Sequence, residues 1–201
     1  WDDAYRFMQD NNDEFVRTNL RQQMLAKLNL SSIAYVSRDA ANVYVVEDDA
    51  GWRKPGHTAE VQRLYGQLVN RLEGSSEEGL AGIMMIGSVP HIVAAQKIRD
   101  TAMLLPANGV VFMTRAIDAD FIKDVEHDTL LRFTVLPVEA FNSLPVAADD
   151  VNAFKIVRED GSINSYSVIR DVFDCAAFCL RLVTGREIAQ LGKRMFLQNF
   201  I

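Results

Sequence analysis

Hydrophobic residues recur at helical spacing in some parts of the chain and at alternate positions in most of the rest. The clearest helical pattern covers residues 61–72, and Gly74 follows it as a stop signal. Its apolar positions share one face and are Val61, Leu64, Tyr65, Leu68, Val69 and Leu72. This segment is therefore predicted to be an amphipathic helix with one buried side.

The first thirty residues predict helices as well. Trp1, Tyr5 and Met8 share a helical face, as in the tail of a longer helix arriving from upstream. Asn11 and Glu14 then fit a capping box, with Asn11 as the N-cap of a second helix. The apolar stripe of that helix consists of Phe15, Val16, Leu20, Met24 and Leu28.

Short runs rich in β-branched or alternating residues predict strands along the rest of the chain. The runs cover residues 33–36, 43–46, 82–86, 92–95, 110–113, 130–136, 154–157, 165–169 and 178–183. Residues 33–46 and 154–169 are predicted hairpins, the latter around the turn dipeptide Asp160-Gly161. Between the strands, residues 118–128 predict a helix and residues 141–151 a loop.

A last helix is predicted after a second capping box at Thr184 and Glu187. With 201 residues, of which 49% are hydrophobic, the chain can bury one sizeable core. We therefore expect a single α+β domain over residues 1–201. It would consist of N-terminal helices (1–30), an α/β core (31–183) and a C-terminal helix (184–201).

Charge and hydropathy narrow the possible partners. The net charge is −6 and no basic cluster is present, which argues against nucleic acid as a partner. No apolar run approaches the roughly 18 residues that a membrane span needs. Because the chain opens at Trp1 without an initiator Met, we expect a segment of a longer protein with membrane helices on both sides.

Catalytic motifs are not visible in the sequence. Gly87-Ser88 lacks the second glycine of a nucleophile elbow, and His57, His91 and His127 have no zinc-type spacing. Cys175 and Cys179 lie about 13 Å apart if they share a strand, beyond the reach of a disulfide. We therefore expect a domain without catalysis of its own, without a cofactor and without a metal.

Five residues are candidates for ligand binding: Trp1, Asp2, Tyr5, His91 and Arg115. Trp1 and Tyr5 either anchor their helix on the sheet or form an aromatic wall for a ligand, with Asp2 beside them as an acceptor. Arg115 ends an apolar strand, where it either pairs with a carboxylate such as Asp118 or binds a ligand carboxylate. His91 and Gln96 alternate across a regular strand, so they cannot both face one pocket.

Several short segments together resemble the fourth class of CHASE domains, which are extracellular sensory modules associated with cyclases and histidine kinases. The segments that carry the resemblance are residues 1–7, 13–16, 19–20, 82–84, 92–95, 106–109, 115–118, 165–171 and 186–188, with Gly192. The resemblance implies a PAS-like or Cache-like fold, with a long N-terminal helix on an antiparallel sheet and a C-terminal signalling helix (184–201) that leads to the membrane. It also implies flanking transmembrane helices and a cytoplasmic output such as a histidine kinase or a cyclic di-GMP enzyme.

The leading hypothesis is therefore a ligand-sensing domain of a bacterial or archaeal signal-transduction receptor in the inner membrane. The domain itself would be periplasmic or extracellular, would form a homodimer and would bind an unidentified small molecule. The alternative is a protein-interaction or dimerisation module that senses a periplasmic partner without a small-molecule ligand. A third possibility, an enzyme, would require titratable residues gathered in one cleft.

Overall fold

The computed structural model describes residues 1–19, 21–39, 43–47, 51–53, 59–144, 154–159 and 161–185. The chain divides into two compact units, Trp1–Ala116 and Ile117–Ile201. Each unit has its own antiparallel sheet, so the predicted α+β class is confirmed. Whether residues 1–201 act as the single domain predicted from the sequence is a separate question, which this division does not test.

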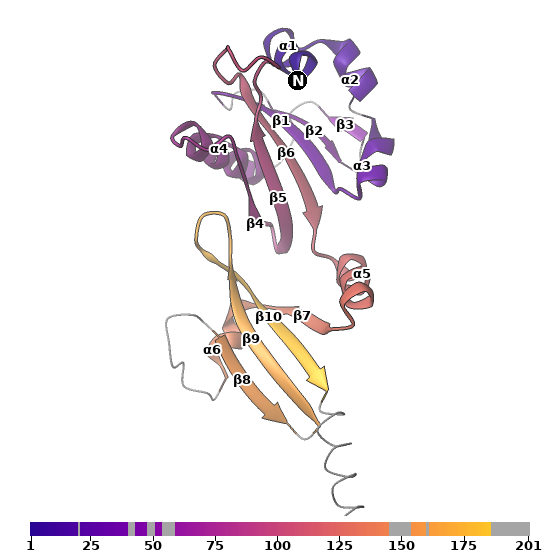
Figure 1. Ribbon diagram of the computed structural model, residues 1–201, viewed down its shortest axis with the longest axis vertical. Helices are drawn as coiled ribbons and strands as arrows, with labels where there is room; N and C mark the ends of the chain where they lie inside the picture. Colours follow the sequence, from indigo (N-terminus) through magenta and orange to yellow (C-terminus); the bar gives the residue numbers. More distant parts are fainter. Residues whose placement is uncertain are drawn as a thin grey trace, which may run out of the picture. The chain divides into compact units, whose positions relative to one another are not determined.

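The first unit is built on a six-stranded sheet (Figure 1). Its strand order is β3 (Gly51–Arg53), β2 (Val43–Glu47), β1 (Ser32–Ser37), β6 (Gly109–Ala116), β5 (Val89–Lys97) and β4 (Gly79–Ile86). All neighbouring strands are antiparallel, and the predicted hairpin of β1 and β2 is present with Tyr35 opposite Tyr44. The sheet joins segments that are far apart in sequence, because β1 pairs directly with β6.

Helix α4 (Ala59–Glu73) confirms the clearest sequence pattern and covers one face of this sheet. Leu64, Tyr65, Leu68, Val69 and Leu72 are buried, as their spacing predicts. Tyr65 stacks on Phe112 of β6 with ring centroids 4.8 Å apart. Successive side chains of a strand point to opposite faces, so Phe112 faces α4 while Val111 and Met113 face the other way.

The opposite face is covered on its β1–β2 side by α1 (Asp2–Asp10), α2 (Asp13–Asn19) and α3 (Gln22–Leu28). Phe7 of α1 is fully buried there and stacks on Phe15 of α2, with ring centroids 4.7 Å apart. Its ring also meets Tyr35 and Tyr44 edge-on. These aromatic contacts fix the helices on the strands.

The helical start of the chain differs from its prediction in two details. The predicted single helix behind Asn11 is two helices, because Arg21 adopts an extended conformation between α2 and α3. Asn11 is the left-handed C-cap of α1, and the side chain of Asn12 instead accepts a hydrogen bond from the Glu14 amide, 2.8 Å away. The predicted helix boundary is therefore present, but the capping side chain belongs to Asn12 and not to Asn11.

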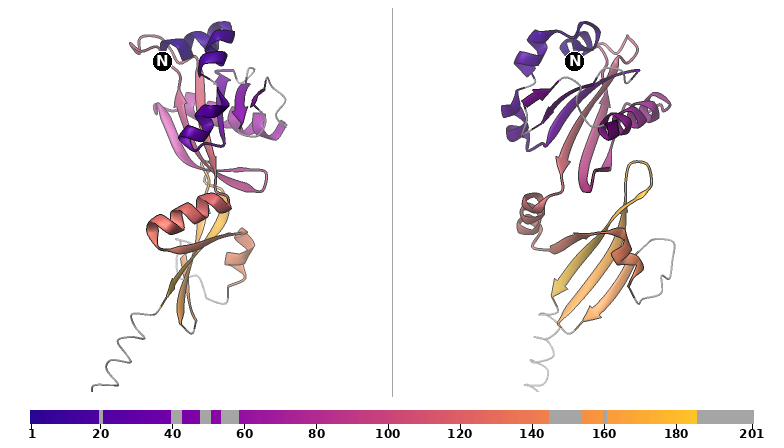
Figure 2. Two further views of the ribbon diagram at one scale, coloured as in Figure 1. Left: turned by 90° about the vertical axis from the view of Figure 1, so that its right-hand side faces the viewer. Right: turned by 180° about the vertical axis from the view of Figure 1, so that it is seen from behind.

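The second unit contains a four-stranded sheet, drawn in orange to yellow in Figures 1 and 2. Its order is β7 (Arg132–Leu136), β10 (Ala176–Gly185), β9 (Ser162–Arg170) and β8 (Phe154–Glu159). Helix α6 (Val138–Asn142) packs Phe141 against Tyr166 and Cys179, and α5 (Ala119–Thr129) precedes β7. Asp118 caps α5 by accepting a hydrogen bond from the Phe121 amide at 2.9 Å.

Predictions for the second unit have mixed outcomes. The hairpin of β8 and β9 is confirmed, although its turn residue Asp160 lies outside the described residues. The loop predicted over residues 141–151 begins inside α6, whose five residues are too few to show a helical period, and residues 145–151 lie outside the described residues. Cys175 is exposed and Cys179 is buried, and both are free thiols. The predicted C-terminal helix (184–201) does not begin at Thr184, because Thr184 and Gly185 end β10, and its other residues lie outside the described part of the chain.

Candidate functional site

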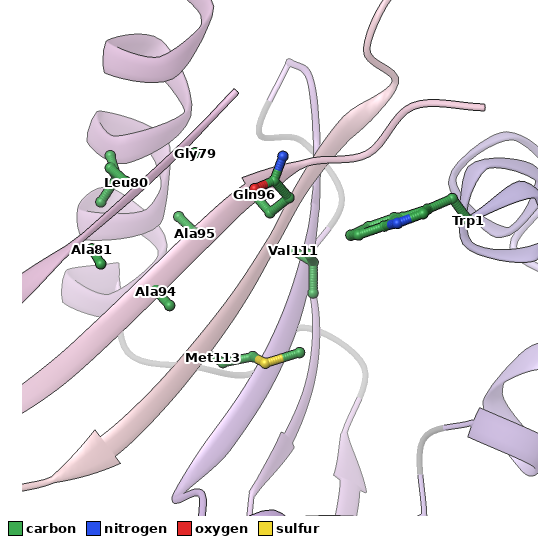
Figure 3. A pocket seen from close by; sticks show the side chains of 9 residues that line it. All are labelled: Trp1, Gly79, Leu80, Ala81, Ala94, Ala95, Gln96, Val111 and Met113. Atoms are coloured by element: carbon green, nitrogen blue, oxygen red, sulfur yellow. The ribbon is translucent and has the colours of Figure 1, made fainter. Parts of the chain in front are cut away.

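A cavity of about 540 Å³ lies in the first unit, on the sheet face opposite α4 (Figure 3). Helices α1 to α3 pack over β1 and β2, and the cavity lies over β4, β5 and β6 on the same face. The residues that line it are Trp1, Gly79, Leu80, Ala81, Ala94, Ala95, Gln96, Val111 and Met113. The floor therefore comes from three strands and the wall from the first residue of the N-terminal helical segment.

The sheet register explains why this surface is hollow. One row across the three strands consists of Ala81, Ala94 and Met113. The next row consists of Gly79, Gln96 and Val111. Both rows start with a residue that has a very small side chain or none, so the floor lies low between the taller side chains of β6 and Trp1.

Trp1 forms the wall because hydrogen bonds hold α1 against the loop between β5 and β6. The Asp2 carboxylate accepts a hydrogen bond from the Thr101 amide at 2.8 Å, and the Tyr5 hydroxyl donates to the Pro106 carbonyl at 3.2 Å. In return, the side chain of Asn108 donates to the Tyr5 carbonyl at 3.2 Å. Figure 3 shows the Trp1 indole reaching from α1 toward the strands, on the side of Val111 and Met113.

Three charged side chains next to the cavity, those of Asp2, Glu78 and Arg99, are engaged within the protein. Backbone and side-chain hydrogen bonding from Thr101 lowers the pKa of Asp2, which favours its charged form. Arg99 donates two hydrogen bonds to Glu78, at 2.7 and 3.0 Å, and a third to the Leu105 carbonyl. The hydrogen bond between Glu78 and Arg99 lowers the pKa of the carboxyl group and raises that of the guanidinium.

The structure places the predicted site residues in different settings. Trp1 lines the cavity, with 60% of its surface exposed. Asp2 and Tyr5 stand behind it, where their polar atoms hold α1 in place. Tyr5 is buried in the core, so the anchoring alternative describes its contacts.

Arg115 and His91 lie on opposite faces of the sheet. Arg115 lies two residues beyond Met113 on the cavity face, opposite Ile92 of β5, and is not among the lining residues. His91 has the parity of the residues that face α4, and its Nδ1 lies 3.0 Å from the Val89 carbonyl. Gln96 lines the cavity, as the alternation with His91 allows. Roles in ligand binding for these residues stay predictions.

Sequence reasoning missed most of the cavity floor. Gly79, Ala81 and Ala94 have no functional groups, so they carry no chemical signal of a site. What identifies them is their position, because Ala81 and Ala94 lie opposite each other on paired strands. Such pairing becomes visible only after the strand register is known.

A second hollow of about 320 Å³ lies between α1 and α2 and has a polar lining that includes Asp3, Arg6 and Glu14. Within the described residues, no group of three or more His, Cys, Asp or Glu side chains could hold a metal ion. Among the helices that the structure describes, none has both the length and the hydropathy needed to cross a membrane.

Comparison with known proteins gives a family and a fold. A family model described as "CHASE4 domain" matches residues 1–136. Among curated proteins, no sequence matches this chain. The extracellular domain of the histidine kinase vpHK1S-Z8 is similar in structure, with a TM-score of 0.51, 11% identity, and coverage of 97% of this chain and 82% of that chain.

A second similar structure is the ligand-binding domain of the Pseudomonas fluorescens chemoreceptor CtaA in complex with L-isoleucine. Its TM-score is 0.50 at 12% identity, and the match covers 94% of this chain and 82% of that chain. At such low identity these likenesses concern the fold, which is a Cache-like arrangement of antiparallel sheets found in extracellular sensor domains. The predicted resemblance to CHASE domains of class four is thereby confirmed.

Proposed function

The chain belongs to the CHASE4 domain family, and we propose that it detects a small molecule in the cavity between Trp1 and the sheet. Domains of this family are extracellular sensors in signal transduction, so the chain is a sensor domain and not itself a catalyst. The predicted function is confirmed at that level.

The single observation that carries the proposal is the position of the cavity. Its volume of about 540 Å³ falls within the range of small-molecule sites. A molecule bound there would contact both the strands and Trp1, next to α1. A ligand shifts an equilibrium only if it contacts one arrangement better than the other. A cavity shared by a helical segment and a sheet provides such a difference, because movement of α1 changes its wall.

The solved structures support a small-molecule ligand. The chemoreceptor domain with the same fold was crystallised with L-isoleucine. Trp1, one of the five residues predicted for ligand binding, lines the cavity of this chain. Asp2 and Tyr5 would act indirectly, by holding the helix that presents Trp1.

We place the domain in the periplasm or outside the cell, as part of a receptor in the inner membrane. This setting rests on the association of the family with membrane-bound histidine kinases and cyclases. In it, transmembrane helices would flank the domain, two copies would form a dimer, and a histidine kinase or a cyclic di-GMP enzyme would carry the output. Sequencing of the complete reading frame would test the topology, because apolar spans are expected on both sides.

A thermal-shift screen tests ligand binding in the cavity. Amino acids, organic acids, nucleobases and neutral aromatic compounds are added to the purified chain, and compounds that raise the melting temperature are retested on Ala94→Leu. The longer side chain would fill the floor, so it should abolish the shift. Ala119→Leu, an exposed substitution in the second unit, is the matched control and should keep it. A shift that survives in Ala94→Leu would contradict the proposed site.

One observation favours the alternative function, a protein-interaction module. Met103, Leu104 and Leu105 expose 70%, 83% and 47% of their surfaces in the loop between β5 and β6. Adjacent exposed apolar residues are typical of protein contacts. Under this alternative, Leu104→Asp would abolish signalling by the receptor while ligand-induced thermal shifts stay unchanged. Normal signalling by this variant would count against it.

A further inference from the structure

The lining of the cavity indicates which ligands it accepts. None of its nine lining residues has a charged side chain. Two of them can form hydrogen bonds through their side chains: Gln96 with its amide and Trp1 with its indole N–H. The other seven side chains are aliphatic, contain a thioether or, in glycine, are absent. The cavity is therefore apolar, with a single amide group on its floor.

Several charged side chains near the cavity already have partners. Asp2 accepts the Thr101 amide, and Asp100 accepts the amides of Leu104 and Leu105. Arg99 is held by Glu78, and the Lys97 ammonium donates to the Ser75 carbonyl at 3.0 Å. Arg115 already takes part in an interaction of its own and lies beyond the lining residues. An ammonium or carboxylate group bound against the lining would therefore find no oppositely charged side chain there, which disfavours it relative to an uncharged group.

The amide of Gln96, in contrast, is placed to meet a ligand. In the described part of the chain no residue forms a hydrogen bond with it, and its oxygen lies over Gly79. A Cβ atom at position 79 would come within 2.6 Å of that oxygen. Glycine at this position therefore leaves room for the Gln96 side chain to lie along the floor and present both a donor and an acceptor.

The shape of the cavity favours a flat molecule. Ala81 and Ala94 contribute only methyl groups to the floor, while the Trp1 indole stands over the same face as Val111 and Met113 (Figure 3). A planar ring can cover the methyl groups and meet the indole in a stacked or edge-on contact.

We propose that the cavity binds an uncharged, flat and mostly apolar molecule with one amide-like hydrogen-bonding group, and excludes free amino acids. The inference rests on the proposed function, because it takes the cavity to be the sensory site. Gln96 would exchange a pair of hydrogen bonds with the amide-like group of the ligand, and Trp1 would cover its ring. This selectivity differs from that of the chemoreceptor domain crystallised with L-isoleucine, although the two domains share a fold.

Isothermal titration calorimetry with one ring in several charge states tests the proposal on the whole chain. The probes are indole-3-acetamide, tryptamine, indole-3-acetate and L-tryptophan, with L-isoleucine as an aliphatic amino acid. Indole-3-acetamide should bind at least about tenfold more tightly than every charged probe. Equal or tighter binding of any charged probe would overturn the inference.

Variants locate the binding. Gln96→Leu should weaken indole-3-acetamide about tenfold and leave 3-methylindole, which lacks the amide, within about twofold. Gln67→Leu, an exposed substitution on α4, is the control and should bind both compounds like the wild type. If Gln96→Leu does not fold, Gln96→Met replaces it with an unbranched side chain. An equal loss of both compounds, or of neither, would overturn the role of Gln96.

The experiment separates the inference from the proposed function. If an amino acid binds and Ala94→Leu abolishes its binding, the cavity is the sensory site but its predicted selectivity is wrong. If none of the indole compounds binds, the selectivity is also wrong, and the broader thermal-shift screen decides whether the cavity binds any ligand.

Discussion

Asp2 joins two segments of the chain through one exposed carboxylate. It accepts a hydrogen bond from Thr101, 99 residues away in sequence, and so ties the start of α1 to the loop between β5 and β6. Hydrogen bonding from Thr101 lowers its pKa in the folded protein. A carboxyl group with a lowered folded pKa stabilises the protein above its unfolded pKa of about 4, and this stabilisation is lost as the pH falls through the folded pKa.

We therefore expect Asp2→Asn to lower the melting temperature at pH 7 by about 1–2 °C, because exposed interactions of this kind are weak. The difference from the wild type should shrink as the pH falls below about 4 and vanish below the lowered folded pKa, where the wild-type carboxyl is also neutral. Differential scanning calorimetry between pH 3 and pH 7 measures it, with Asp3→Asn as the exposed neighbouring control. A difference that stays constant with pH would contradict the argument.

Residue chemistry predicted only part of the candidate site. Trp1 was predicted because it is a large aromatic residue, and it does line the cavity. Period-two alternation correctly separated Gln96 from His91, because this argument needs only a regular strand. Ala81 and Ala94 could not be predicted, since their contribution is empty space that exists only where β4 and β5 pair. A sequence shows functional groups more readily than it shows hollows.

Elements were predicted best where a pattern is long. The stripe from Val61 to Leu72 gives α4 because it covers three turns, and hairpins are visible because both strands alternate around a turn. The stripe from Phe15 to Leu28 predicted one helix where there are two, because a break at Arg21 leaves the apolar spacing almost unchanged. Helix α6 is too short to produce any period.

The packing of α4 allows a direct prediction at this scale. Leu68 is fully buried, so Leu68→Ala should lower the free energy of unfolding of the first unit by about 2–5 kcal/mol through lost burial and a cavity. Its neighbour Gln67 is exposed, and Gln67→Ala should change that free energy by less than about 0.5 kcal/mol. Urea unfolding followed by tryptophan fluorescence measures both. A loss below about 1 kcal/mol for Leu68→Ala would show that α4 is not an integral part of the core.

At the scale of the whole molecule, the chain provides a separate reporter for each compact unit. Trp1 and Trp52 are its two tryptophans, and both belong to the first unit. Cys179 is buried in the core of the second unit, where burial raises the pKa of its thiol and suppresses the reactive thiolate. Tryptophan fluorescence therefore follows unfolding of the first unit, and thiol labelling of Cys179 follows unfolding of the second. Cys175 is exposed and is replaced in Cys175→Ser to remove its background.

If the two units are separate thermodynamic bodies, core substitutions will act on one reporter each. Phe141 is buried against Tyr166 and Cys179, and its carbonyl accepts a hydrogen bond from the Lys155 ammonium at 3.0 Å. In the Cys175→Ser background, Phe141→Ala should therefore lower the free energy of unfolding of the second unit by about 3–5 kcal/mol. The urea midpoint of Cys179 labelling should fall accordingly, and the fluorescence midpoint should stay unchanged. Leu68→Ala should lower the fluorescence midpoint and leave the midpoint of Cys179 labelling unchanged.

Equal shifts of both midpoints in either variant would mean that the units unfold as one body, in which case the single domain expected from the sequence would be the better description. Independent midpoints would mean that a ligand in the first unit stabilises that unit alone, so that any signal reaching the second unit requires a change of arrangement and not a shared gain in stability.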